Sequence, residues 1–492
     1  MTFSDIVAKL NGFAWGPVML VLLVGTGIYL TVRVGFFQFG KFGYIMKSTL
    51  GKIFKKYDVG KGEVSPFQAL TTALAGTVGT GNIAGVTGAI IAGGPGAVFW
   101  MWISALFGMV TKYSEVVLAV KYRERNSKGD WVGGPMYYIK NGLGKAWTWL
   151  GIVFCVLGTL ASFGIGNMTQ VNTIASSINN AIDTFGGNVN AHTVAIFGQN
   201  VPYASIIIGV IIAIIVGLVL FGGIKRIGST TEKLVPVMAV IYILGSLAII
   251  LFNAKYIGPA FAMIFKGAFS AKAALGGVFG ITVMKTIQKG VGRGVFSNEA
   301  GLGSAPIAHA ATSQKSPVRQ GFYGVFEVFM DTIIICSMTA LVLLTSIARG
   351  NVQVEWGGSG GAEFIAASFG TLFGNKAGSL IVAIGLTLFA LSTVFSWSLY
   401  GTRCFEYIFG TKAVKIYQVV FIIVIVLGST LEMQLAWDIA DTLNGFMAIP
   451  NLIALLALSG VVIKRTKLHF KKHFHPGEGY DEEEDDEEEQ NA

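Results

Sequence analysis

Residues 75–82 read AGTVGTGN and lie in the middle of an apolar run, residues 66–92, that is long enough to cross a bilayer. Three of these eight positions are glycine, which disfavours a helix because each glycine costs about 1 kcal/mol relative to alanine. Unwound backbone at membrane depth is tolerated only where it is buried in protein or lines a cavity. Its carbonyls can coordinate a cation, and the start of the next half-helix can hold a carboxylate. The stretch therefore predicts a broken helix with a binding site; close packing of small residues is the alternative.

A second stretch, residues 290–306, interrupts another apolar run with five glycines and a proline, and it reads GVGRGVFSNEAGLGSAP. The two interruptions fall in the second and the seventh of eleven apolar runs, so that each begins a set of five. Interruptions at matching positions of two halves indicate a transporter built from inverted repeats. The eleven runs lie near residues 13–33, 66–92, 95–120, 147–175, 203–222, 234–253, 285–312, 321–347, 377–409, 414–431 and 437–463.

These runs predict an all-α, polytopic membrane protein with about eleven transmembrane helices, divided into four parts. Residues 1–65 would hold an extra helix and a basic loop, residues 66–270 the first repeat, residues 271–463 the second repeat, and residues 464–492 a basic and then acidic tail. From residue 477 onward the tail is too acidic to bury apolar surface, so we expect it to be disordered.

The composition also indicates a membrane protein, because 53% of the residues are hydrophobic and only 13% are charged, against about 25% charged in soluble domains. The net charge is +9, but the basic residues gather in alternate loops, such as residues 33–61 and 121–128, whereas residues 176–204 hold no lysine or arginine. This is the positive-inside pattern. It predicts a cell-membrane protein with its N-terminus outside and its C-terminus cytoplasmic. It also accounts for the positive net charge without a nucleic-acid partner. Neither a metal motif nor a catalytic cluster of side chains indicates an enzyme.

Residues 93–108, GGPGAVFWMWISALFG, resemble the signature of the alanine/glycine:cation symporter family, and so do FSNEAG at 296–301 and GSAP at 303–306. The resemblance covers nearly the whole chain apart from the acidic tail. It implies a LeuT-type fold of five plus five helices and sodium-coupled uptake of alanine or glycine by alternating access. Some members of that family are proton-coupled or carry glutamine. A proton-coupled carrier, or a carrier of glutamine or another small solute on the same fold, is therefore the alternative.

A fainter similarity to the neurotransmitter:sodium symporters, at residues 78–82, 296–297 and 392–393, indicates where cations bind. Sodium prefers hard oxygen ligands. The candidate ligands are Ala75, Val78, Ser392 and Thr393 at one site, and Asn82 and Ser297 at a second. The first site would use two main-chain carbonyls and two hydroxyls. In the alternative, the hydroxyls of Ser392 and Thr393 bond only to carbonyls of their own helix. Asn82 and Ser297 then contact the substrate or pack against other side chains.

For the substrate, we expect N–H groups at the first interruption to hold a carboxylate and polar side chains to bind the ammonium group. The candidate substrate-binding residues are Gly79, Thr80, Gly81, Gln170, Phe296, Asn298, Thr393 and Trp397. The two aromatic residues among them would form the walls of a small pocket, which would select small side chains; ordinary packing is the alternative. For Gln170 the alternative is a hydrogen bond between helices.

Charged side chains inside a membrane are costly and usually functional. The candidates for gating or for carrying a proton are Arg293, Glu299, Glu327 and Asp331. The last two are four residues apart, so we expect them on one helical face. Arg293 is expected to face a vestibule and to form an outer gate with an acidic residue, or else to extend to the interface. Lys112 and Glu115, three residues apart, are expected to pair on one helix face. We expect His309 at the inner interface.

Overall fold

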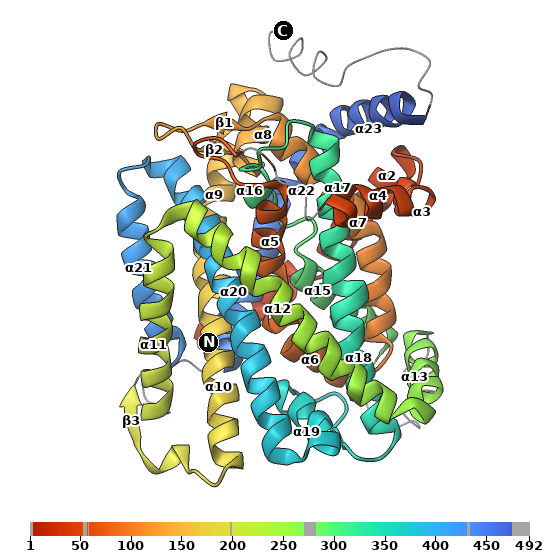
Figure 1. The fold of residues 1–492 in the computed structure, drawn as a ribbon, viewed down its shortest axis with the longest axis vertical. Helices are drawn as coiled ribbons and strands as arrows, with labels where there is room; N and C mark the ends of the chain where they lie inside the picture. The colour runs from red at the N-terminus through yellow and green to blue at the C-terminus, as the bar shows by residue number, and fades with distance from the viewer. Residues whose placement is uncertain are drawn as a thin grey trace.

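The computed structural model describes residues 3–52, 57, 59–196, 199–269, 282–430 and 433–474. Within them the chain forms a bundle of long helices with two short antiparallel hairpins (Figure 1). Eight helical stretches of this part are long and apolar enough to span a membrane, and a bent pair of helices makes a ninth. Two shorter helices stand where the seventh and tenth spans are expected. The prediction of an all-α membrane protein with about eleven spans is confirmed.

The first half of the chain consists of many short elements and several long helices (Figure 1). They are α1 (Phe3–Ala14), α2 (Pro17–Arg33), α3 (Phe37–Gly40), α4 (Phe42–Thr49), η1 (Leu50–Lys52), α5 (Pro66–Thr77), η2 (Gly81–Gly85), α6 (Val86–Gly93), α7 (Ala97–Lys121), β1 (Glu124–Arg125), β2 (Trp131–Val132), α8 (Pro135–Gly142), η3 (Lys145–Trp147), α9 (Thr148–Phe163), η4 (Gly164–Met168), α10 (Thr169–Thr184), η5 (Val189–Ala191), β3 (Thr193–Ile196), β4 (Gln199–Pro202), α11 (Tyr203–Leu220), α12 (Gly223–Phe252), η6 (Ala254–Tyr256) and α13 (Ile257–Phe269).

The second half has fewer and longer elements. They are α15 (Val283–Asn298), α16 (Pro306–His309), α17 (Pro317–Val328), η7 (Phe329–Cys336), α18 (Ser337–Ala348), α19 (Ala362–Phe373), α20 (Asn375–Phe409), α21 (Val414–Gly428), α22 (Met433–Ala457) and α23 (Ser459–Phe474). The expected start of the second repeat at residue 271 and the expected disorder from residue 477 onward lie outside the described residues.

Some elements differ from the expectation. The fourth span extends through α10 to Thr184, because Ile178, Ala181 and Ile182 continue its apolar face beyond the predicted end. Two short helices between spans, α13 and α19, were not predicted; α13 packs against α7 and α18, and α19 packs against α20. Both are shorter than a bilayer requires, so an apolar-run criterion misses them.

The first interruption in the sequence is a break between two helices. α5 begins at a capping box in which the Ser65 hydroxyl accepts from the Gln68 N–H and the Gln68 side chain accepts from the Ser65 N–H, both at 3.1 Å. The helix ends at Thr77, Val78 is extended with ψ 92°, and a π-helical turn, η2, starts at Gly81. The two parts are bent by 47°. We call residues 78–80 the first break.

The second interruption is also unwound. α15 ends at Asn298, and Glu299 then adopts a left-handed conformation with φ 55°. Gly301 and Gly303 follow with φ 94° and 80°, values that glycine reaches without the steric penalty of a Cβ atom. The chain becomes helical again at Pro306. We call residues 299–305 the second break.

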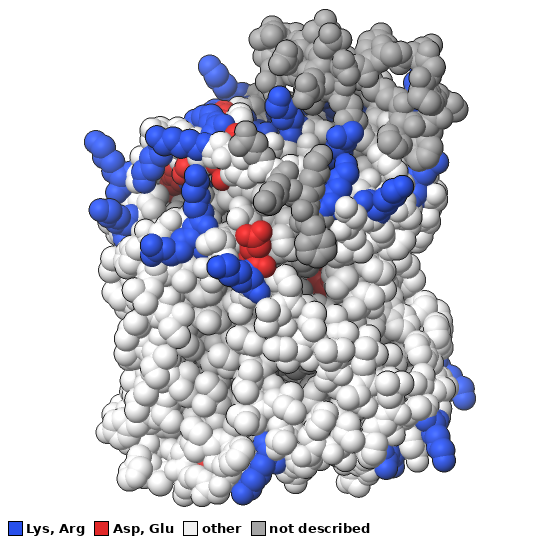
Figure 2. All heavy atoms as spheres, viewed as in Figure 1, with Lys and Arg blue, Asp and Glu red and all other residues white. Residues whose placement is uncertain are grey.

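The charges divide the molecule along its long axis. In Figure 2, lysine and arginine side chains gather at the upper end, where β1, β2 and α8 lie, and the broad zone below them is almost uncharged apart from a few basic groups at the lower edge. An uncharged zone between two charged ends is the distribution expected of a protein that spans a bilayer.

At the upper end the β1–β2 hairpin is tied to the residues that precede α5. The Glu63 carboxylate accepts from Trp131 Nε1 at 2.9 Å and from the Gly60 N–H at 3.1 Å, and it pairs with Arg125 at 2.6 Å. Partial burial raises the pKa of Glu63, but these hydrogen bonds and the charge of Arg125 together outweigh it, so that the pKa lies below its ordinary value.

Replacement of this carboxylate is expected to give a pH-dependent loss of stability. A lowered folded-state pKa means that Glu63 stabilises the fold above the unfolded-state pKa and that the contribution is lost as the pH falls through the folded-state value. We expect Glu63→Gln to lower the melting temperature by about 2 °C at pH 7, and we expect this difference to shrink as the pH falls below about 4.3, the ordinary pKa of glutamate. Thermal unfolding across this pH range, with the exposed Glu355→Gln as control, tests it; a difference that is independent of pH would contradict it.

Candidate functional site

The first break lies against α10 and α20. The Gly79 N–H donates to the side-chain oxygen of Asn82 at 2.8 Å, and the Thr80 N–H donates to Gln170 Oε1 at 3.3 Å. A Cβ atom at Gly79 would overlap with the hydroxyl of Thr393. The Thr80 hydroxyl is fully buried and has no hydrogen-bond partner within the described part of the chain. A buried polar group without a partner is rare in proteins, so this hydroxyl makes the break a candidate place for a ligand.

The candidate ligands of the first cation site lie together where α20 meets α5. Ser392 Oγ donates to the Ala75 carbonyl at 3.4 Å, and it also donates to Phe389 O, within its own helix, at 2.8 Å. Thr393 Oγ1 donates to Phe389 O at 3.1 Å. Val78 follows the last turn of α5 and is buried. Both hydroxyls thus bond within their own helix and also lie beside the break, so that they could turn to a cation.

The candidate ligands of the second site surround a carboxylate. Asn82 Nδ2 donates to Asp331 Oδ1 at 2.6 Å, and Ser297 Oγ donates to the same oxygen at 3.1 Å. Thr332 Oγ1 donates to Asp331 Oδ2 at 2.7 Å, and Cys336 Sγ lies 3.4 Å from the Asn82 amide. The structure adds Thr332 and Cys336 to this group, which sequence reasoning missed because nothing in the local pattern marks them.

Glu327 and Asp331, which were expected on one helical face, contact different groups. The chain is π-helical from Phe329 to Cys336. Asp331 joins the group around Asn82. Glu327 instead lies 3.4 Å from Lys112 and 3.1 Å from His309 Nε2, and all three side chains are fully buried.

The structure also gives the contacts of Lys112 and His309. Lys112, which was expected to pair with Glu115, lies 3.4 Å from Glu327 of α17, because α7 and α17 pack side by side, and it interacts with Glu115 electrostatically. His309, which was expected at the inner interface, is fully buried, with Nδ1 2.8 Å from the side-chain nitrogen of Gln320. Its place in α16, inside the bundle, explains the burial.

The aromatic candidates occupy different positions. A Cβ atom at Gly81 would lie 3.3 Å from the Phe296 ring, so this ring faces the first break. Trp397 is fully buried and donates Nε1 to Glu299 Oε1 at 2.7 Å, which links α20 to the second break. Asn298 also braces that break, since its side-chain oxygen accepts from the Ala300 N–H at 2.9 Å.

Arg293 has an acidic neighbour that the sequence did not identify. Its guanidinium lies 3.5 Å from Asp441 of α22 and 4.7 Å from the centre of the Phe296 ring. Both charged side chains of this pair are 19% exposed. An acid at this position agrees with the hypothesis of a charged gate. Asp441 lies in a long apolar run, and only the packing of α22 brings it to Arg293.

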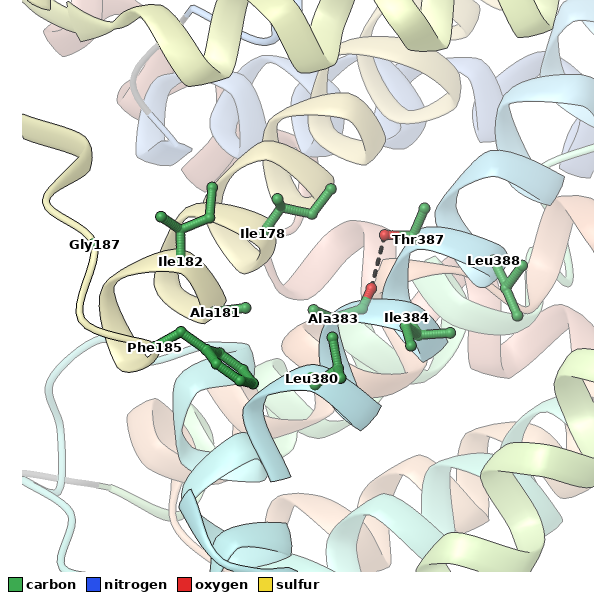
Figure 3. A pocket seen from close by; sticks show the side chains of 10 residues that line it. All are labelled: Ile178, Ala181, Ile182, Phe185, Gly187, Leu380, Ala383, Ile384, Thr387 and Leu388. Atoms are coloured by element: carbon green, nitrogen blue, oxygen red, sulfur yellow. Dashed lines mark hydrogen bonds between the residues drawn. The ribbon is translucent and has the colours of Figure 1, made fainter. Parts of the chain in front are cut away.

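A separate cavity of about 560 Å³ lies between α10 and α20, away from the two breaks. Figure 3 shows the ten residues that line it, on both helices and on the segment that follows α10. Only Thr387 has a polar side chain, and it donates its hydroxyl to the Ala383 carbonyl at 2.7 Å, the dashed line in Figure 3. Side chains of this kind have nothing to offer a charged ligand, so the breaks remain the candidate site.

Comparison with known proteins identifies the family and the fold of this chain. The model of the sodium:alanine symporter family matches residues 1–484. The chain belongs to this family. The sodium/alanine symporter AgcS of Methanococcus maripaludis is 48% identical over 472 residues, which cover 95% of this chain and 97% of AgcS. The probable sodium/glutamine symporter GlnT of Bacillus subtilis is 36% identical over 468 residues, 94% of this chain and 90% of GlnT.

The fold also matches a solved structure. The crystal structure of MhsT in complex with L-phenylalanine covers 83% of this chain and 99% of its own, with a TM-score of 0.58 and 14% identity. At that identity the match shows the fold alone, and it confirms the predicted LeuT-type architecture. As a member of the sodium:alanine symporter family, the chain is a multi-pass membrane transporter and not an enzyme.

Proposed function

We propose that this member of the family imports alanine and glycine with sodium as the coupling ion. The observation that carries the proposal is the Thr80 hydroxyl, which is fully buried at the first break and without a hydrogen-bond partner in the described chain. Its neighbour Gly79 lies against the buried Thr393, and the main chain between α5 and η2 is unwound there. N–H groups and hydroxyls of this kind suit a substrate carboxylate and a hard cation.

The close packing around the first break supports a small substrate. Thr393 and Gln170 lie against Gly79 on one side, and Phe296 lies against Gly81 on the other. Neighbours this close favour a substrate whose side chain is no larger than hydrogen or methyl. Glutamine, which the name of GlnT suggests for that relative, would need more space and is the alternative substrate.

We assign the sodium ions to the two candidate groups. The first ion would bind Ser392, Thr393 and carbonyls at the end of α5. The second would bind Asn82 and Ser297, and there Asp331 adds a carboxylate to the predicted oxygen ligands. The same carboxylate would carry the proton if the chain is proton-coupled, with Glu299 and Glu327 as further candidates.

The transport cycle that we propose is alternating access between two inverted repeats, residues 66–270 and 271–463, with the N-terminus outside the cell. Ions and substrate bind together at the breaks, and their joint occupancy favours closure to the extent that the closed state binds them more tightly. The Arg293–Asp441 pair closes the outer side. The bilayer covers the uncharged zone in Figure 2.

Uptake of labelled alanine into proteoliposomes tests the function. We expect accumulation under an inward sodium gradient, no accumulation under a proton gradient, and strong competition by unlabelled glycine. Accumulation under the proton gradient alone would overturn sodium coupling. Competition by glutamine but not by glycine would overturn the assigned substrate, and no uptake of alanine by folded protein would exclude alanine itself.

A further inference from the structure

Glu115 of α7 is fully buried and makes contacts that the proposed ion and substrate sites do not use. Its Oε1 atom accepts from the Gly301 N–H at 3.1 Å, from the Gly303 N–H at 3.0 Å and from the Asn451 amide of α22 at 2.5 Å. Hydrogen bonds to an ionised acceptor are roughly twice as strong as neutral ones. One carboxylate oxygen thus receives two of the main-chain N–H groups that the second break leaves without helical partners.

Two glycines of the second break bring their N–H groups to this acceptor. Gly301 and Gly303 both have positive φ, 94° and 80°, and both direct their N–H groups to the same oxygen. A Cβ atom at Gly301 would lie 2.8 Å from a methyl of Leu23. The buried side chains of Leu302 and Glu299 also hold this segment, Glu299 through Trp397 and Ser304, and Glu115 holds its two glycines, which have no side chain of their own.

The same face of α7 also holds the helix that follows the break. Lys112, one turn before Glu115, pairs with Glu327 at 3.4 Å, and Glu327 contacts His309 of α16 at 3.1 Å. The Lys112 ammonium also interacts electrostatically with Glu115, which offsets the cost of burying that carboxylate. α7 therefore holds the second break through Glu115, and it holds α16 through Lys112 and Glu327.

We propose that Glu115 is the positioning residue of the second break. It touches neither ion nor substrate; it holds the unwound chain so that Ser297 and Asn298, the last residues of α15, keep their hydrogen bonds to Asp331 and Thr332. This inference rests on the proposed function for its transport readout, since a displaced second break would weaken alanine and sodium binding together.

The first experiment is amide hydrogen exchange on the purified protein, which does not depend on the identity of the substrate. Glu115→Gln keeps the side-chain shape but removes the charge, and we expect faster exchange confined to residues 299–305. The matched control is Ser114→Ala, because Ser114 is also fully buried and its hydroxyl bonds within α7, to Val110 O at 2.7 Å. Unchanged exchange in Glu115→Gln would overturn the proposal, even if alanine proves not to be the substrate.

The second experiment is a double-mutant cycle with Asn451, which donates to Glu115 and to the Gly301 carbonyl at 2.9 Å. We expect Glu115→Gln and Asn451→Ala each to raise the KM for alanine about tenfold, and the double variant to be little worse than either, since both act on one segment. If the two increases in KM multiply in the double variant, the proposal is overturned. A lower melting temperature with an unchanged KM would overturn it too. Wild-type protein without alanine uptake would instead refute the proposed substrate and leave the exchange result standing.

Discussion

Replacement of Gly79 by alanine is expected to abolish amino-acid uptake while the protein remains folded. The added Cβ atom would overlap with Thr393 Oγ1 and lie 3.2 Å from Gln170 Oε1. Both neighbours belong to the candidate site, so the break or α20 has to shift at that site. Displacements of about 1 Å near reacting or binding groups cost on the order of 100-fold in rate, and we expect at least that loss in the initial rate of alanine uptake.

The matched control is Gly385→Ala. Gly385 is on α20, the helix that carries Thr393, but a Cβ atom added there meets nothing within 4 Å. We expect wild-type uptake from this variant, and size-exclusion profiles that are alike for the two variants and the wild type. Full uptake by Gly79→Ala would show that the first break is not the binding site.

The second large effect is expected at the two hydroxyls of α20. Ser392→Ala and Thr393→Val each remove one oxygen from the proposed sodium site and nearly keep the side-chain volume. Each is expected to raise the sodium concentration for half-maximal uptake about tenfold, which corresponds to about 1.4 kcal/mol of binding free energy. Uptake of labelled alanine at graded sodium concentrations measures the change.

Ser398→Ala is the control for these two variants. Ser398 is also buried on α20, but its hydroxyl donates to Phe395 O, within the helix, at 2.6 Å, and its loss is expected to leave the sodium dependence unchanged. If Ser392→Ala and Thr393→Val behave like this control, their hydroxyls serve only the hydrogen bonds within α20, and the first sodium site is elsewhere.

Much of the architecture follows from local sequence. Apolar runs of about 20 residues predict spans because each helix has to satisfy its own backbone in the membrane. Glycine-rich stretches at residues 75–82 and 290–306 predict both breaks, since the cost of glycine in a helix is a local property. The apolar-run pattern did not predict the short helices α13 and α19, because they are amphipathic or too short for a span.

The candidate site could be predicted in part. The residues at the first break and on α20 were predicted to lie together, and they do: Ser392 meets the Ala75 carbonyl, and Thr393 lies against Gly79. The link from Trp397 to Glu299 was not predicted, because it joins residues 98 positions apart.

By itself, the sequence determined that this chain is a multi-pass helical transporter with two broken helices at matching positions. Only the tertiary structure decided how the buried charges are paired. Asp331 joins Asn82 and Ser297, Lys112 pairs with Glu327, Glu115 holds the second break, and Asp441 meets Arg293. The physical reason is that hydropathy and glycine content act along the chain, whereas the partner of a buried charge comes from another helix.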